Sequence, residues 1–132
     1  MPDLGTVATA TRYALGGIRI VNGAIGLVAP AVIQKRLGDT ASASNPAAIY
    51  GLRLFGVRTV VIGADLLRLR GDALTHAVRS APLIHASDTL TVLTLLRKKQ
   101  LAPELARPLA LISGVNTLLA VTAFVTHRRS GT

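Results

Sequence analysis

Hydrophobic residues fill four long segments of this chain, and turn-forming residues separate them. The segments lie at about residues 12–33, 47–69, 74–96 and 108–127. Apolar and polar residues do not alternate within them as in a half-buried strand, so each segment predicts a helix. The connections are short, so neighbouring helices are expected to run antiparallel. The pattern predicts an all-α fold, an up-down four-helix bundle in a single domain over residues 1–132.

Signals at the helix ends refine these boundaries. Asn45 can cap the second helix, with Pro46 at its first position. Pro108 is expected to open the last helix, because proline is favoured at the first helical position. The C-terminal tail, from Arg128 onward, is expected to fray because nothing in the pattern ties it down.

The third segment is the least regular because Pro82 lies inside it. A longer helix that kinks at the proline is one interpretation. In the other, Ser80 caps a helix that starts at Ala81. The cap is preferred, with a short amphipathic piece over residues 72–79 lying near the membrane interface.

Composition narrows the class of protein. Half of the residues are hydrophobic and 16% are charged, which is more apolar than an average soluble domain. The net charge is +9, but the basic residues stand at segment ends, as the flanking charges of membrane helices do. No stacking aromatics lie between them, so nucleic acid is not expected as a partner. Cysteine is absent, and no nucleophile motif, phosphate loop or zinc signature occurs, so no cofactor and no metal are expected.

The charges inside the apolar segments bear on membrane insertion. Residues 108–127 carry no formal charge, and twenty helical residues can span a bilayer. The second segment contains Arg53, Arg58 and Asp65, and one arginine at a helix centre costs about 2.5 to 3.5 kcal/mol. We therefore expect the charged side chains of such a helix to pair with polar groups of neighbouring helices when it inserts into a membrane. A soluble bundle would need a polar outer face that the last segment lacks, so an integral protein of the cell membrane is preferred.

Small and polar residues share a face of the first segment. Gly16, Arg19, Gly23 and Gly26 lie on it, with Asn22 beside it. Glycines let another helix approach closely, and in lipid they favour helix association. Arg19 and Asn22 are either binders of an anion or a lipid headgroup, or an internal pair beside a packing seam. The second interpretation is preferred.

Arginines outnumber acids in the apolar segments. A carboxylate in bidentate geometry holds a buried arginine best, and Asp65 and Asp88 are the acids deep in these segments. We expect each acid to pair across helices with one of three arginines. These are Arg19, Arg53 and Arg58. One positive charge is then left over, which favours an anionic ligand such as a lipid phosphate or a carboxylate.

The third and fourth segments add further polar groups. His85 and Asp88 lie at i and i+3 on one face, and Asn116 lies on a hydrogen-bonding face of the last segment. A His–Asp pair can move protons or bind a metal, but a structural hydrogen bond from His85 is preferred. The candidate ligand-binding residues are Arg19, Asn22, Arg53, Arg58, Asp65, His85, Asp88 and Asn116.

A longer pattern resembles a known family. RLFGVRTVVIGADLL, from Arg53 to Leu67, is followed by HASDTL, from His85 to Leu90. This order resembles a family of small, uncharacterised four-helix membrane proteins of bacteria and fungi. The resemblance covers roughly residues 13–96. It implies a polytopic membrane protein and offers no activity to transfer, and Asp65 and His85 depart from the pattern. The matching positions are Arg53, Gly56, Arg58, Gly63 and Asp88.

Three functions follow as hypotheses. The first is a membrane bundle without enzymatic activity that binds a lipid or small hydrophobic anion, or that is an accessory subunit of a membrane complex. The alternative is a small oligomeric transporter or channel subunit with a path past the same charges. The third is a membrane enzyme that uses His85 and Asp88, which fails if His85 is sealed in the core. The expected partners are membrane lipid and a second copy of the chain or another membrane protein.

Overall fold

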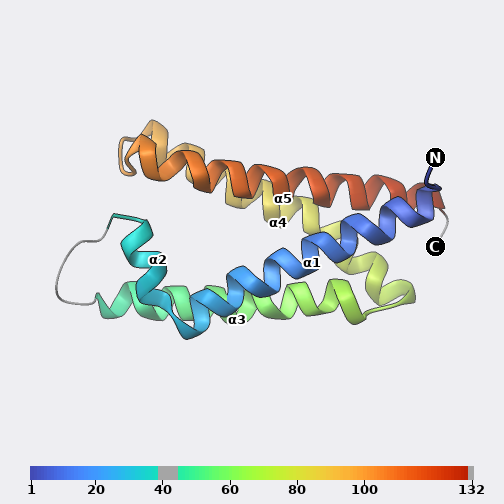
Figure 1. The fold of residues 1–132 in the computed structure, drawn as a ribbon, viewed down its shortest axis with the longest axis horizontal. Helices are drawn as coiled ribbons and strands as arrows, with labels where there is room; N and C mark the ends of the chain where they lie inside the picture. Colours follow the sequence, from blue (N-terminus) through green and yellow to red (C-terminus); the bar gives the residue numbers. More distant parts are fainter. Residues whose placement is uncertain (39–44, 131–132) are drawn as a thin grey trace.

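The computed structural model describes residues 1–38 and 45–130, and α-helix is the regular secondary structure throughout these ranges (Figure 1). The all-α prediction is confirmed. The described part of the chain has five helices, so the predicted count of four is not confirmed. The helices are α1 (Leu4–Val28), α2 (Pro30–Arg36), α3 (Pro46–Arg68), α4 (Gly71–Arg97) and α5 (Pro103–Ser130).

The predicted helix over 12–33 is wrong because a proline divides it. α1 ends at Val28, Pro30 begins α2, and the two helices are bent by 100°. Ala29 between them has φ −130° and ψ 56°, since the residue before a proline avoids the helical region. α1 also begins earlier than predicted. The N–H of Thr6 donates to Asp3 Oδ1 at 2.6 Å, and this backbone hydrogen bond lowers the pKa of the Asp3 carboxyl.

The ends of α3 and α5 show one prediction confirmed and one wrong. Asn45 caps α3 by accepting hydrogen bonds from the N–H groups of Ala47 and Ala48, with Pro46 in the first turn. α5 begins at Pro103 rather than at Pro108. Pro108 is the sixth residue of α5. It lacks a backbone N–H and removes one helical hydrogen bond, but only near the start of the helix, where the N–H groups of the first turn have no intrahelical partner either. The tail expected to fray from Arg128 is helical to Ser130, and residues 131–132 lie outside the described residues.

α4 runs unbroken through Pro82, so the preferred cap at Ser80 is wrong. The Ser80 hydroxyl donates to the backbone oxygens of His76 and Ala77, at 3.0 and 3.2 Å. It bonds back into the preceding turn and does not cap a new helix. The piece expected as separate over residues 72–79 is the first part of the same helix, and the alternative of one longer helix is correct.

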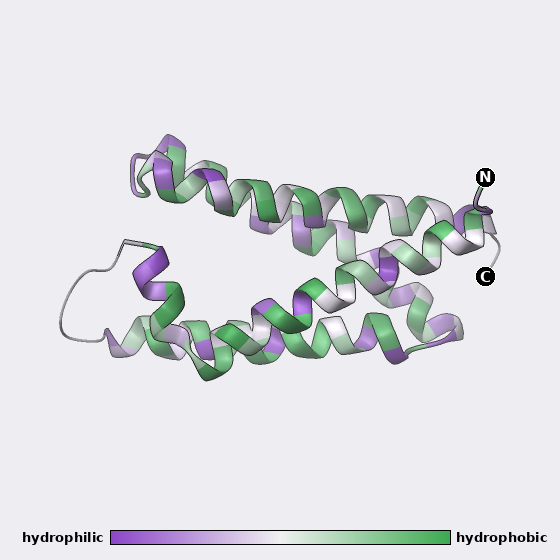
Figure 2. Ribbon diagram, viewed as in Figure 1, coloured by the Kyte–Doolittle hydropathy of each residue, from purple (hydrophilic) through white to green (hydrophobic). Residues whose placement is uncertain are grey.

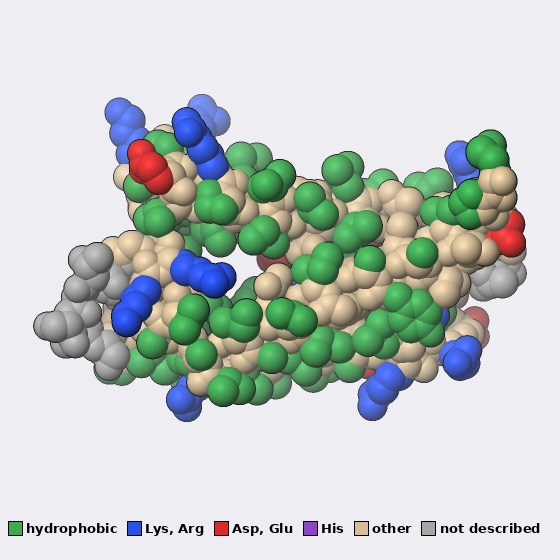
Figure 3. Space-filling model, viewed as in Figure 1, with side chains coloured by type: hydrophobic (Ala, Val, Ile, Leu, Met, Phe, Trp, Pro, Cys, Tyr) green, Lys and Arg blue, Asp and Glu red, His purple; other side chains and the backbone are tan. Residues whose placement is uncertain are grey.

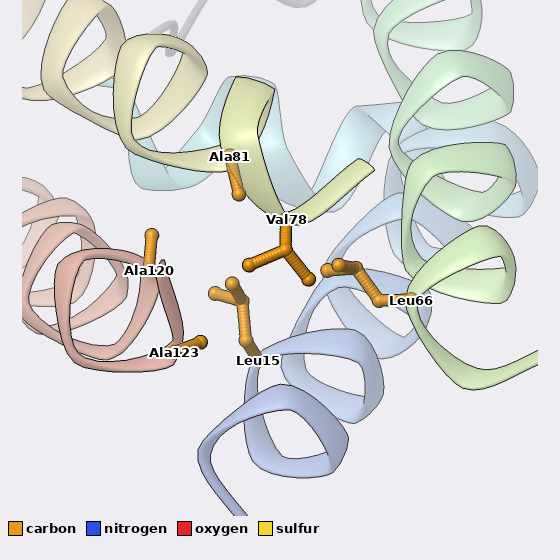
Figure 4. Close-up of a cluster of buried hydrophobic side chains, with 6 residues drawn as sticks. All are labelled: Leu15, Leu66, Val78, Ala81, Ala120 and Ala123. Carbon is orange, nitrogen blue, oxygen red and sulfur yellow. The ribbon is translucent and has the colours of Figure 1, made fainter. Parts of the chain in front are cut away.

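The four long helices form two pairs, which α1 connects. α1 lies antiparallel to α3, and α4 lies antiparallel to α5 (Figure 1). α1 also contacts α5, so it joins the two pairs. The four long helices meet at one apolar cluster, in which the side chains of Leu15, Val78 and Leu66 point toward one another (Figure 4). The cluster consists of Leu15, Leu66, Val78, Ala81, Ala120 and Ala123. Beyond it, toward α2, the two pairs separate.

Glycines bring α1 and α3 into backbone contact, as the small-residue face predicted. A Cβ added at Gly56 would lie 2.5 Å from the Leu27 nitrogen and 2.6 Å from the Gly23 oxygen. One added at Gly63 would lie 2.8 Å from the Gly16 oxygen. No side chain fits at these positions without moving a helix. We call the contact of Gly16, Gly23 and Gly26 with Gly56 and Gly63 the glycine seam.

Two helices of the described chain, α3 and α5, are long and apolar enough to cross a membrane. α1 and α2 pass the same test only if taken together across their bend. α4 does not pass it, although its segment resembled the others in length. Along α5, most positions between its ends are hydrophobic or close to neutral, and its charged residues lie toward the two ends (Figure 2). Leu111 and Leu118 on this helix are each 69% exposed, as expected for side chains that contact lipid.

Candidate functional site

The most deeply buried charge in the described chain is the Arg19 guanidinium. Only 4% of Arg19 is exposed, and it lies on the α1 face that meets the other helices. Its Nε donates to His85 Nε2 at 3.1 Å. Its Nη2 lies 3.6 Å from Asp88 Oδ2, close enough for attraction but too far for a hydrogen bond. One edge of the guanidinium is therefore held, and the other keeps an unpaired donor.

His85 orients Arg19 from behind. His85 is completely buried, and because its Nε2 accepts from Arg19, the ring proton is assigned to Nδ1. Nδ1 lies 4.0 Å from Asp88 Oδ2 and makes no hydrogen bond. Three residues from two helices thus form one group, since His85 and Asp88 stand at i and i+3 on α4. Its charged members are Arg19 and Asp88.

A cleft of about 440 Å³ opens where the two helix pairs separate. The space-filling view shows this hollow, with Lys or Arg side chains at its edge (Figure 3). Most of its wall is apolar, and α2 closes part of one side. The apolar residues lining it are Ile25, Ile33, Leu37, Leu52, Phe55, Val92, Leu109 and Ile112.

Four of the polar side chains that line the cleft lie at its inner end. Arg19, Thr59, Asp88 and Asn116 lie there, one from each of the four long helices. Leu52 and Leu109 line the other end of the cleft. Each stands seven residues before the inner-end residue of its own helix, Thr59 on α3 or Asn116 on α5, so the two ends are about 10 Å apart along the helix axes. The amide oxygen of Asn116 is buried and lacks a hydrogen-bond partner. Two buried polar atoms at the inner end, Arg19 Nη2 and Asn116 Oδ1, thus lack hydrogen-bond partners.

The structure brings together half of the candidate residues in one cleft. Arg19, Asn22, Asp88 and Asn116 line it, and of the pairings left open by the sequence, the structure shows Arg19 with Asp88.

The other candidates lie elsewhere. His85 packs behind Arg19, outside the cleft wall, and Arg53 is exposed on α3 away from the cleft. Asp65 pairs with Arg68 on its own helix at 3.9 Å, so the expected pairing of Asp65 across helices is wrong. Arg58 is exposed but acts electrostatically on both Arg19 and Asp88.

Sequence reasoning missed the part of the site that α2 supplies. Arg36 and Leu37 line the cleft because the break at Pro30 turns α2 back toward it. A helix that continued past Pro30 without a bend would carry Arg36 and Leu37 away from the cleft. Pro30 inside an apolar run was the available signal.

The arrangement bears on the proposed chemistry of His85. Since His85 is sealed in the core, the condition set for an acid–base role with Asp88 is not met. Over the described ranges, no group of three or more His, Cys, Asp or Glu side chains is placed to hold a metal ion. What the cleft offers is a positive charge and amide or hydroxyl groups at the end of an apolar chamber.

Comparisons with protein-family models, with curated proteins and with solved structures found no match to this chain. The family resemblance of residues 13–96 therefore stays a prediction, and the functional argument depends on the cleft.

Proposed function

We propose that this protein is a helical bundle of the cell membrane that binds a small hydrophobic anion or a lipid in its cleft and catalyses no reaction. The observation that carries the proposal is the Arg19 guanidinium, which is 4% exposed, lines the cleft and keeps Nη2 without a hydrogen-bond partner. A buried charge with an unused donor is unfavourable unless something supplies the missing interaction. An anionic group at the inner end of the cleft would do so.

The charge near the inner end supports an anion rather than a cation. Arg19 and Arg58 are two positive charges that act on the single negative charge of Asp88. One positive charge remains after Asp88 is counted. Arg36, which is exposed, adds another at the wall formed by α2. An anion is attracted to this set, and a cation is repelled by it.

The apolar surroundings support a hydrophobic ligand and a membrane location. Half of the residues that line the chamber are aliphatic or aromatic, and such side chains bind apolar groups by excluding water. α3 and α5 are long and apolar enough to cross a bilayer. A ligand that partitions into lipid could enter from the bilayer through the gap between the helix pairs. Since one copy supplies the whole cleft, the proposal requires no second copy.

Native mass spectrometry in mild detergent tests the proposal. We expect the purified protein to carry one anionic amphiphile per copy, identified by fragmentation. Arg19→Gln is expected to lower that occupancy by about tenfold or more, because a hydrogen bond to a charged group is lost. Arg53→Gln is the matched control, since it removes an exposed arginine that does not line the cleft.

Two results would overturn this proposal. One is a wild-type protein that carries no anion at any lipid load. The other is equal occupancy in Arg19→Gln and Arg53→Gln while both keep the helical circular dichroism of the wild type.

A further inference from the structure

We infer that the ligand of the cleft is a single-chain monoanion of the fatty-acid type, bound with its carboxylate against Arg19 and its chain along the apolar walls. This inference rests on the proposed function and narrows it to one class of ligand. It follows from the volume of the cleft, the charge at its inner end and the order of polar and apolar residues along it.

The volume of the cleft suits a ligand with one chain. The cleft holds about 440 Å³, and a water molecule occupies about 30 Å³ in the liquid. At a comparable volume per non-hydrogen atom, the space suits about 15 such atoms. A saturated carboxylate of twelve carbons has that size, whereas a two-chain phospholipid is several times larger. A larger lipid would have to leave most of its surface outside the cleft.

The charge at the inner end favours a ligand with one negative charge. Asp88 also lines the cleft, with 38% of its side chain exposed, and it lies 3.6 Å from Arg19. It therefore repels part of any anion that approaches the guanidinium. Arg58 and Arg19 together exceed Asp88 by one charge, so a carboxylate neutralises the inner end. A phosphate monoester, with nearly two charges, exceeds the surplus at the inner end and would need Arg36, on the wall formed by α2, as a second partner.

The groups at the inner end match a carboxylate. A guanidinium presents planar paired donors that suit two carboxylate oxygens, and the Arg19 Nη2 donor is unused. Asn116 lines the cleft, and the NH₂ of its amide can donate to an anion. Ser113, one turn away on α5, lines the cleft as well. The apolar residues that line the rest of the cleft, among them Ile25 and Leu109, would then contact the hydrocarbon chain of the ligand.

The test uses the full-length protein in nanodiscs of uncharged phosphatidylcholine at alkaline pH, with carboxyl-labelled dodecanoate as the probe, observed by carbon NMR. We expect a bound carboxyl resonance that saturates at one dodecanoate per protein. Arg19→Gln is expected to weaken binding by about ten- to a hundredfold, and Arg53→Gln to leave it unchanged. Dodecanol and dodecyl phosphate are expected to compete poorly, because the first lacks the charge and the second carries too much.

A second variant keeps the test decisive if Arg19→Gln does not fold. Leu109→Trp fills the cleft from α5 without touching Arg19, and Leu111→Trp places the same residue on the outer surface of α5. We expect Leu109→Trp to abolish dodecanoate binding and Leu111→Trp to preserve it. Equal binding by these two variants, or competition by dodecanol as strong as by dodecanoate, would overturn the inference.

The two proposals can fail separately. If native mass spectrometry finds an Arg19-dependent anion that is a phospholipid or a phosphate monoester, the proposed function stands and the fatty-acid assignment is wrong. If neither that measurement nor the NMR titration finds any Arg19-dependent anion, both are wrong.

Discussion

Gly56→Ala is expected to lower the free energy of unfolding by about 3 kcal/mol, at the upper end of the range for overpacking. The added methyl would lie 2.5 Å from the Leu27 nitrogen and 2.6 Å from the Gly23 oxygen. Both obstacles are backbone atoms, so no side chain can rotate away. α1 and α3 would have to separate, and their separation would also displace Arg19, which lies on α1 within the glycine seam. Reversible unfolding in detergent, followed by circular dichroism, measures the loss.

Gly51→Ala is the matched control for this prediction. Gly51 is on the same helix, and a Cβ added there meets no atom within 4 Å. Alanine favours helix over glycine by about 1 kcal/mol, so this variant is expected to be as stable as the wild type or slightly more stable. If both variants unfold at the same denaturant concentration, the close approach of α1 and α3 is contradicted.

Asp88→Asn is expected to lower the free energy of unfolding by about 2 kcal/mol. Removing one partner of a fully buried ion pair costs about 3 to 5 kcal/mol, because the other charge is left unpaired. Arg19 is buried, but the Asp88 side chain is 38% exposed, so solvent screening reduces the effect. Asparagine keeps the shape of the side chain, so the change isolates the charge. The same unfolding assay measures it, with no added ligand.

Asp65→Asn provides the comparison. Asp65 faces Arg68 at 3.9 Å on one helix, and the Arg68 side chain is 75% exposed. Surface pairs of this kind contribute about 0 to 1 kcal/mol, so a small loss is expected. If Asp65→Asn and Asp88→Asn lower the free energy of unfolding equally, the burial of Arg19 does not strengthen its ion pair with Asp88, and the account of this pair is contradicted.

Features that depend on residues close in sequence could be predicted. Asn45 followed by Pro46 predicted the start of α3 correctly, because a cap needs only its own helix. The small-residue face of α1 predicted the glycine seam for the same reason, since helical spacing places those glycines on one side. Arg19 and Asp88 were among the residues expected to pair across helices, although the choice of these two required the tertiary arrangement that brings the Arg19 side chain to α4.

The features that could not be predicted depend on tertiary context at prolines. Pro30 ends a helix, Pro82 lies within one, and Pro108 lies near the start of another. The residue is the same in each case, but its effect depends on how neighbouring helices satisfy or shield the backbone groups around it. The cleft arises from this difference, because the bend at Pro30 turns α2 to form part of its wall. The sequence therefore indicated the charges of the site but not the chamber in which they lie.

Accessibility of a single cysteine tests the central claim, that this bundle lies in a membrane, most directly. The chain contains no cysteine, so Leu118→Cys on α5 and Gln100→Cys before it each give one reactive thiol. Both native residues are exposed, so burial in the protein protects neither site. In lysed membranes without detergent, we predict that a charged maleimide labels Gln100→Cys and leaves Leu118→Cys unlabelled until detergent denatures the protein. Labelling of both at equal rates before detergent is added would contradict the membrane assignment.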